Sequence, residues 1–447
     1  MFPYASKRVL ATGLLALVTA LAGCATHADR LRDIRRDFYA GNAETAAATI
    51  DRCLKGNPRE ADVLKLDRAI LELCSGRPKE AERLLREVRD RFDYLEQKSL
   101  AEGSLMMVTD DTYASYPGED YEKILIRAFL ALANLMGDGD DAAAYGLQVV
   151  DTQERIIQAG AEESGENPKL AYKRVALGAY IHAALREETH ANYDDAARSF
   201  ARVVSWEPEF PFGRGDVQRA TYGRHSAPGN GVLYIFALVG RGPLKEEAVE
   251  LPATVTALVG DRVLSHNLKH TLPPTIAPIK VPKVVVWPNS TRGVGVAVDG
   301  RPAGTTAAIT DVGRLAVEQY QAIYPQVLLR ALVRRAAKKG IIYGGKEALG
   351  VQNNSLANVA LDLGGIVWEA TESADTRCWG LLPDQIQVLR LELPAGEHRI
   401  GLRPDDRLGL SGADYATAVQ INDGRNSYLL ANFAEGRLIG QIVSSRH

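Results

Sequence analysis

The sequence feature that most constrains the fold is a spacing of small and apolar residues that recurs through the first half of the chain. A small residue is followed by apolar residues four and seven positions later and by a proline at position twelve. The complete copies are Ala46, Ile50, Cys53, Pro58 and Ala196, Phe200, Val203, Pro208. Intervals of four and three place side chains on one face of an α-helix, and proline cannot continue a helix. The pattern therefore predicts amphipathic helices that pack on their neighbours.

Two incomplete copies extend the pattern: they are Ala81, Leu85, Val88 and Ala143, Leu147, Val150. The spacing resembles the second helix of the tetratricopeptide repeat, in which the small residue lets two helices approach closely. The resemblance implies a degenerate, short superhelix over residues 24–210. In such arrays each unit buries its apolar face on its neighbours and leaves an extended concave surface, which we expect to bind a partner.

The composition changes near residue 211. Residues 211–231 are rich in glycine and proline and predict a linker. Short β-branched or apolar runs bounded by turn residues follow in 232–383, and residues 384–447 contain further strands. We therefore expect an α+β fold, with N-terminal helical repeats followed by a β-sandwich-like region with inserted helices.

Two helices are expected as insertions in the mixed β domain, at 311–339 and 356–372. Pro325 lies inside the first and predicts a kink or a break there. Asp299-Gly300, directly after an apolar run, is typical of a hairpin turn.

The motif Leu393-Pro394-Ala395-Gly396-Glu397-His398, followed by alternating Ile400 and Leu402, resembles the strand-joining turn of small PEGA-like β-sandwich domains. Those domains occur in bacterial envelope proteins. The resemblance implies a PEGA-like β region over 384–447.

The N-terminal 24 residues predict an export signal. Lys7 and Arg8 precede an apolar run of about 13 residues, which is too short to cross a bilayer of ~30 Å as a helix. The run ends in Leu21-Ala22-Gly23-Cys24, which resembles the lipobox of bacterial lipoproteins. The resemblance implies removal of residues 1–23 and acylation of Cys24, whereas in an ordinary secretory signal Cys24 would be incidental.

Residue Ala25 follows the cysteine where an aspartate would retain a lipoprotein at the inner membrane. The lipobox resemblance therefore implies a lipid-anchored protein of the cell outer membrane that faces the periplasm. It does not distinguish which leaflet carries the anchor. The periplasm permits disulfides, so Cys53 and Cys74 either form a bridge or are small buried residues.

Several motifs together resemble a family of proteobacterial tetratricopeptide lipoproteins of unassigned activity. They are the lipobox, the repeats, Tyr121-Glu122-Lys123, Ala374-Asp375-Thr376-Arg377-Cys378-Trp379 and Leu382-Pro383. That family has serine at the position of Cys378, so we expect no shared function for this thiol. The resemblance implies a location and an architecture, and no reaction.

Charge and motifs argue against several classes of function. Removing 1–23 takes away two basic residues and no acidic one, so a net charge of −3 becomes −5, which does not suit a nucleic-acid binder. Gly340 to Lys346 spells G-x-x-x-x-G-K, but Glu347 replaces the Ser or Thr that a nucleotide site requires. His266 and His270 have no further ligands nearby. We expect no catalytic residue, no metal, no cofactor and no nucleotide.

Four residues are candidate partner contacts. Tyr113 and Tyr116 lie in an atypical stretch, 92–120, that either presents aromatic rings to a partner or packs over the helices. Arg334 and Arg335 belong to a basic amphipathic helix, which either contacts an acidic partner or anionic lipid, or packs on the sheet.

Asp375 and Arg377 present a similar choice: they form a structural ion pair or bind a carboxylate. The function we expect is that of a non-catalytic scaffold for protein–protein interaction in the cell envelope, in support of peptidoglycan synthesis or envelope assembly. Binding of cell-wall glycan or peptide through the β region is the alternative.

Overall fold

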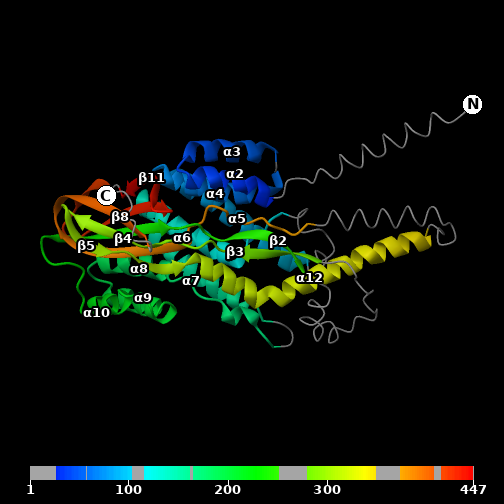
Figure 1. Cartoon of the computed structure of the whole chain (residues 1–447). Coiled ribbons are helices and arrows are strands. Elements are labelled where there is room, and N and C mark those ends of the chain that lie inside the picture. The colour runs from blue at the N-terminus through cyan, green and yellow to red at the C-terminus, as the bar shows by residue number, and fades with distance from the viewer. Residues whose placement is uncertain are drawn as a thin grey trace, which may run out of the picture.

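A computed structural model describes residues 27–56, 58–102, 115–161, 165–250, 279–348, 373–406 and 414–445. Helices form the N-terminal half, and sheets with one long helix form the C-terminal half (Figure 1). The chain is therefore an α+β protein, as expected. The expected signal peptide with Cys24, residue Tyr113, the histidines 266 and 270 and the helix at 356–372 lie outside the described residues.

The helices of the first half pack in chain order, each on the next. They are α2 (His27–Tyr39), α3 (Ala43–Gly56), α4 (Ala61–Cys74), α5 (Pro78–Glu102), α6 (Asp120–Met136), α7 (Ala142–Gln158), α8 (Leu177–Glu188), α9 (Tyr193–Trp206) and α10 (Gly213–Thr221), with 3₁₀ turns η1 (Pro58–Glu60) and η3 (Pro168–Ala171). Helix α10 occupies residues 213–221 of the linker expected over 211–231 and packs on α9. The linker prediction is wrong at these residues because Val217 and Ala220 give the segment an apolar side.

The recurring spacing lies on α3, α5, α7 and α9. Its small residue and the apolar residue four positions later are fully buried in α3, α5 and α9. In α7 the expected position Val150 is buried and Ala143 is half-buried, but Leu147 is 37% exposed and the neighbouring Gly146 is buried instead. The prediction for α7 is thus confirmed at Val150 and wrong at Leu147. A Cβ on Gly146 would lie 2.7 Å from the carbonyl oxygen of Gly178, so glycine permits the close contact of α7 with α8.

The described residues of the C-terminal half form three sheets. Their strand orders are β11-β10-β1-β7-β6, β5-β4-β8-β9 and β2-β3. The strands are β1 (Asn230–Val239), β2 (Leu244–Glu250), β3 (Ile279–Val285), β4 (Thr291–Val298), β5 (Arg301–Thr305), β6 (Ala307–Asp311), β7 (Gln385–Pro394), β8 (Gly396–Asp406), β9 (Tyr415–Ile421), β10 (Asn426–Ala434) and β11 (Arg437–Ser444). The hairpin expected at Asp299-Gly300 is confirmed: it joins β4 to β5, and both residues have positive φ.

Strand β1 lies at the centre of the molecule. It pairs in parallel with β10 and antiparallel with β7. Alternate residues face opposite sides: Tyr234 and Phe236 join the core shared with the helices, whereas Leu233 and Ile235 join the core shared with the four-stranded sheet. A strand buried on both faces reads as a continuous apolar run, as β1 does from Val232 to Val239. The protein is therefore built in three layers, helices, five-stranded sheet and four-stranded sheet.

The two β segments are interleaved. β1 and β6, from residues 232–383, share the five-stranded sheet with β7, β10 and β11, from residues 384–447. β4 and β5 share the other sheet with β8 and β9 in the same way. The turn at 394–396 leads from β7 in one sheet to β8 in the other. The expected boundary at residue 384 therefore divides strands that form common sheets.

Helix α12 (Val312–Ala348) continues through Pro325. The expected helix at 311–339 is present, but a break at the proline is not. Leu328 and the residues around it pack on β3, which supports the helix on both sides of the proline. Among the described helices none is both long and apolar enough to cross a membrane.

Candidate functional site

Helices α2, α4, α6 and α8 form an inner row that contacts the sheets. An extended stretch of chain, residues 373–384, runs along this row before it enters β7; we call it the inner-face segment. Arg35 of α2 donates a hydrogen bond to the carbonyl oxygen of Gly380. Asp67 of α4 accepts one from the N–H of Leu381 at 2.8 Å, and Glu122 of α6 accepts one from the N–H of Trp379 at 2.7 Å. Three helices thus bind the backbone of one segment.

Apolar packing reinforces these bonds. Trp379 is fully buried, and its ring centroid lies 5.2 Å from that of Phe129 in α6. A Cβ on Gly380 would lie 2.4 Å from Leu31 of α2, so the segment passes this helix at a distance that only glycine permits. The inner face is therefore filled by the protein's own chain.

Burial changes the pKa of both carboxylates that hold the segment. Asp67 and Glu122 are each completely buried. Burial raises the pKa of Asp67 to about 8, although the N–H of Leu381 and the charge of Arg35 act against the rise. Burial, assisted by the charge of Glu119, raises the pKa of Glu122 to about 7, against the opposing charge of Lys245. Both groups are therefore poised to titrate near neutral pH.

Charged and aromatic groups close the N-terminal end of α6. Lys245 is buried and its Nζ lies 2.5 Å from Glu119. Burial alone would lower the pKa of Lys245, but the charges of Glu119, Asp375 and Glu122 together outweigh it and the pKa is raised. Asp375 and Arg377 form the expected ion pair at 2.7 Å, and the Arg377 guanidinium lies 5.2 Å from the ring centroid of Tyr116.

This arrangement corrects the expected role of Tyr116. The residue is 2% exposed, and its hydroxyl donates a hydrogen bond to Glu122 at 2.7 Å. It is therefore unavailable to a partner, because it packs between α6 and the inner-face segment. The alternative in which the aromatic stretch packs over the helices is the one that holds for Tyr116.

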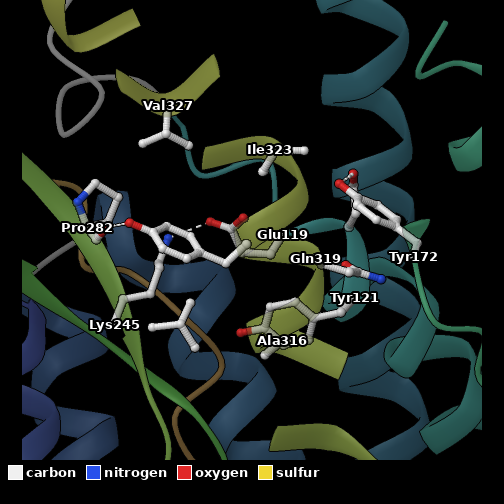
Figure 2. A pocket seen from close by; sticks show the side chains of 12 residues that line it. Glu119, Tyr121, Tyr172, Lys245, Pro282, Ala316, Gln319, Ile323 and Val327 are labelled. Carbon is white, nitrogen blue, oxygen red and sulfur yellow. Dashed lines mark hydrogen bonds and ion pairs between the residues drawn. The ribbon is translucent and has the colours of Figure 1, made fainter. Parts of the chain in front are cut away.

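A cavity of about 50 Å³ lies beside this cluster, between α6, the β2–β3 pair and α12 (Figure 2). Its lining residues are Glu119, Asp120, Tyr121, Tyr172, Lys245, Pro282, Val284, Ala316, Gln319, Tyr320, Ile323 and Val327. Polar groups and apolar walls thus meet in one partly open space. A cavity of this volume holds more than one water molecule or a small chemical group.

Most polar side chains of the cavity already have partners. Asp120 pairs with Lys169 at 2.7 Å and accepts a hydrogen bond from Tyr172. The hydroxyl of Tyr320 donates to the carbonyl oxygen of Pro282. Gln319 differs: it is 3% exposed, and neither its amide oxygen nor its amide nitrogen has a hydrogen-bond partner.

The other expected site residues lie apart from this cavity. Positions 334 and 335 lie in the C-terminal half of α12, away from the cavity-lining turns at 316–327. Cys53, Cys74 and Cys378 are free thiols, so no bridge joins the first two. Within the described ranges, no group of three or more His, Cys, Asp and Glu side chains could hold a metal ion.

Sequence reasoning missed Asp67, Lys245 and Gln319. Asp67 has a visible signal, because it lies within a helix whose neighbouring residues are mostly apolar and buried. Gln319 has none, since its unpartnered amide depends on how α12 packs against α6 and β3.

Comparison of the chain with protein-family models, with curated proteins and with solved structures gives no match.

Proposed function

We propose that the chain is a lipid-anchored, non-catalytic interaction protein of the cell outer membrane, which faces the periplasm and supports peptidoglycan synthesis or envelope assembly. The anchor is the lipidated Cys24 implied by the lipobox resemblance. Attachment to a surface raises the effective concentration of a partner on the same surface, so a weak contact suffices.

The inner row of helices is occupied by the inner-face segment, so the partner surface lies elsewhere. The observation that carries the proposal is helix α12, whose C-terminal part reaches beyond the body of the protein (Figure 1). The helix has 37 residues, a length of about 55 Å. Its first half packs on β3 through Leu328 and Tyr324, and the remainder extends away from that contact.

The sequence of the extended part is basic. Arg330, Arg334 and Lys338 recur at intervals of four, which places these positions on one side of the helix, and Arg335 and Lys339 adjoin them. Residues 326–346 contain no Asp or Glu. A partner of complementary chemistry is an envelope protein with an acidic surface, because opposite charges speed and orient association.

The test is capture of interacting proteins by in-cell crosslinking of the full-length chain. We expect the double variant Arg334→Glu/Arg335→Glu to lose its crosslinked partner by about tenfold or more. The matched control is Arg198→Glu/Arg202→Glu, which makes the same charge change on the exposed face of α9. Equal crosslinking of wild type and the α12 variant, or equal loss in both variants, would contradict the proposal.

A further inference from the structure

The start of α2 is the described part of the chain that is nearest in sequence to the proposed lipid anchor. Cys24 precedes His27, the first residue of α2, by three positions, and three residues span at most about 11 Å. An acylated Cys24 sits at the level of the lipid headgroups, because its acyl chains enter the bilayer. The end of the molecule at which α2 begins is therefore held close to the membrane surface.

The first turn of α2 is fixed to the turn that follows α3. His27 is buried, and its Nδ1 atom lies 3.2 Å from the Oε2 atom of Glu60 in η1. Arg30 donates a hydrogen bond of 3.0 Å to the same carboxylate. Helix α3 packs on both α2 and η1, and Figure 1 shows that α3 ends where α2 begins. The end of α3 and η1 therefore approach the membrane together with the start of α2.

This end of the molecule carries three basic residues, which we call the anchor-side cluster: Arg52 and Lys55 near the end of α3, and Arg59 in η1. All three residues are exposed. No Asp or Glu lies between positions 52 and 59. Among the described residues, no acidic side chain forms an ion pair with Arg52 or Lys55. The cluster is thus a positive surface whose charge is available to an anionic partner.

The acidic side chains around the cluster are already engaged. Their basic partners lie within 4 Å: Asp29 with Arg32, Asp51 with Arg68, Glu60 with Arg30 and Asp62 with Arg91. Cations in the last turn of a helix also complement the helix dipole, but Arg59 lies outside α3. The dipole therefore does not account for the whole cluster.

We propose that the anchor-side cluster docks on the anionic phospholipid headgroups of the membrane that holds Cys24. Each basic residue close to an anionic membrane strengthens association by about fivefold, and the effect falls off within a Debye length of ~8 Å at physiological salt. A cluster next to the anchor is within that range, whereas basic residues elsewhere on the protein are not held there. The proposal rests on the lipid anchor of the proposed function and is independent of partner binding by α12.

The experiment is photo-crosslinking of the full-length, lipidated chain in vesicles of phosphatidylcholine and phosphatidylglycerol. The phosphatidylglycerol carries a photoreactive headgroup, and mass spectrometry locates the lipid adducts in the chain. We expect the adducts on α3 and η1. Salt at about 1 M shortens the Debye length to ~3 Å and should reduce these adducts by about tenfold without releasing the protein. The same photoreactive group on phosphatidylcholine, in vesicles without phosphatidylglycerol, should give a similar reduction.

A double variant tests the assignment to the cluster. Arg52→Gln/Lys55→Gln removes two positive charges without breaking an ion pair of the described residues, and should lose the adducts on α3 and η1 by about tenfold or more. The matched control is Arg198→Gln/Arg202→Gln, which removes two charges from the exposed face of α9 and should keep the adducts.

Sedimentation of the same vesicles reports the anchor separately. A lipidated chain that fails to sediment with them would contradict the anchor and this proposal with it. A chain that sediments contradicts this proposal alone if wild type and the α3 variant give equal adducts, if anionic and neutral lipids give equal adducts, or if the adducts are confined to α12.

Discussion

The carboxylate of Asp67 accepts a hydrogen bond of 2.8 Å from the backbone N–H of Leu381, a residue 314 positions later in the chain. Asp67 lies in α4, and Leu381 belongs to the inner-face segment that leads into β7. Because β7 pairs with the central strand β1, this bond connects the helical array to the middle of the sheets. Helices and sheets should therefore unfold together.

The raised pKa values of Asp67 and Glu122 predict a stability that falls as the pH rises. In the unfolded chain both carboxyls lose their protons near pH 4, whereas in the folded protein their pKa values are about 8 and about 7. The folded state holds the protons more tightly, so its advantage is complete below pH 4 and is lost as the pH rises through these values. We expect the free energy of unfolding to fall by on the order of a few kcal/mol between pH 5 and pH 8, measured by urea denaturation.

Asp67→Asn is the matched control for this pH dependence. The amide oxygen can still accept from Leu381, but the side chain no longer titrates. Between pH 5 and pH 8 the free energy of unfolding of the variant should fall less than that of the wild type. Identical slopes in the two proteins would mean that Asp67 does not contribute.

Trp379→Ala should destabilise the whole protein by about 3–5 kcal/mol, because the indole is fully buried against Phe129. Urea denaturation followed by far-UV and near-UV circular dichroism should give coincident transitions, since helices and sheets share this core. The control Trp287→Ala removes an indole that is 44% exposed and should cost less than about 1 kcal/mol. Unfolding transitions that differ between the far-UV and the near-UV range would contradict the three-layer account.

Gly440 and Gly436 form a matched pair that tests the contact of β11 with α4. Both have positive φ, at 76° and 72°. A Cβ on Gly440 would lie 2.1 Å from the carbonyl oxygen of Cys74, whereas a Cβ on Gly436 would meet nothing within 4 Å. Gly436→Ala should cost about 1–2 kcal/mol through its backbone alone. Gly440→Ala should cost about 1–3 kcal/mol more, and equal costs in thermal unfolding would argue against the contact.

Sequence reasoning located the elements that local patterns determine. Strand β1 contains the first of the apolar runs predicted in 232–383, and α9 carries the predicted buried residues Ala196, Phe200 and Val203. Such patterns are local, since the period of a helix or strand is set by its own residues. The burial of Gly146 in place of Leu147 in α7 was not predictable, because it depends on the contact between Gly146 and Gly178 in the next helix.

The candidate site was largely hidden from the sequence for the same reason. The filling of the inner face depends on hydrogen bonds between residues far apart in the chain: Glu122 and Trp379 are separated by 257 positions, and Asp67 and Leu381 by 314. Tyr116 was identified as notable, but its burial depends on Arg377 and Lys245, which come from distant segments. The position of Asp67 among the apolar residues in the middle of α4 was the one available signal.

The measurement that tests the proposed function most directly is membrane fractionation of the Cys24→Ser variant beside the wild-type chain. Acyl chains on Cys24 would hold the protein on the membrane, since burial of each CH₂ contributes about 0.8 kcal/mol. We predict that the wild-type protein sediments with the outer membrane. The variant, once circular dichroism has shown that it is folded, should appear in the fraction without membranes. A folded variant that still sediments with the outer membrane would contradict the lipid anchor on which the account rests.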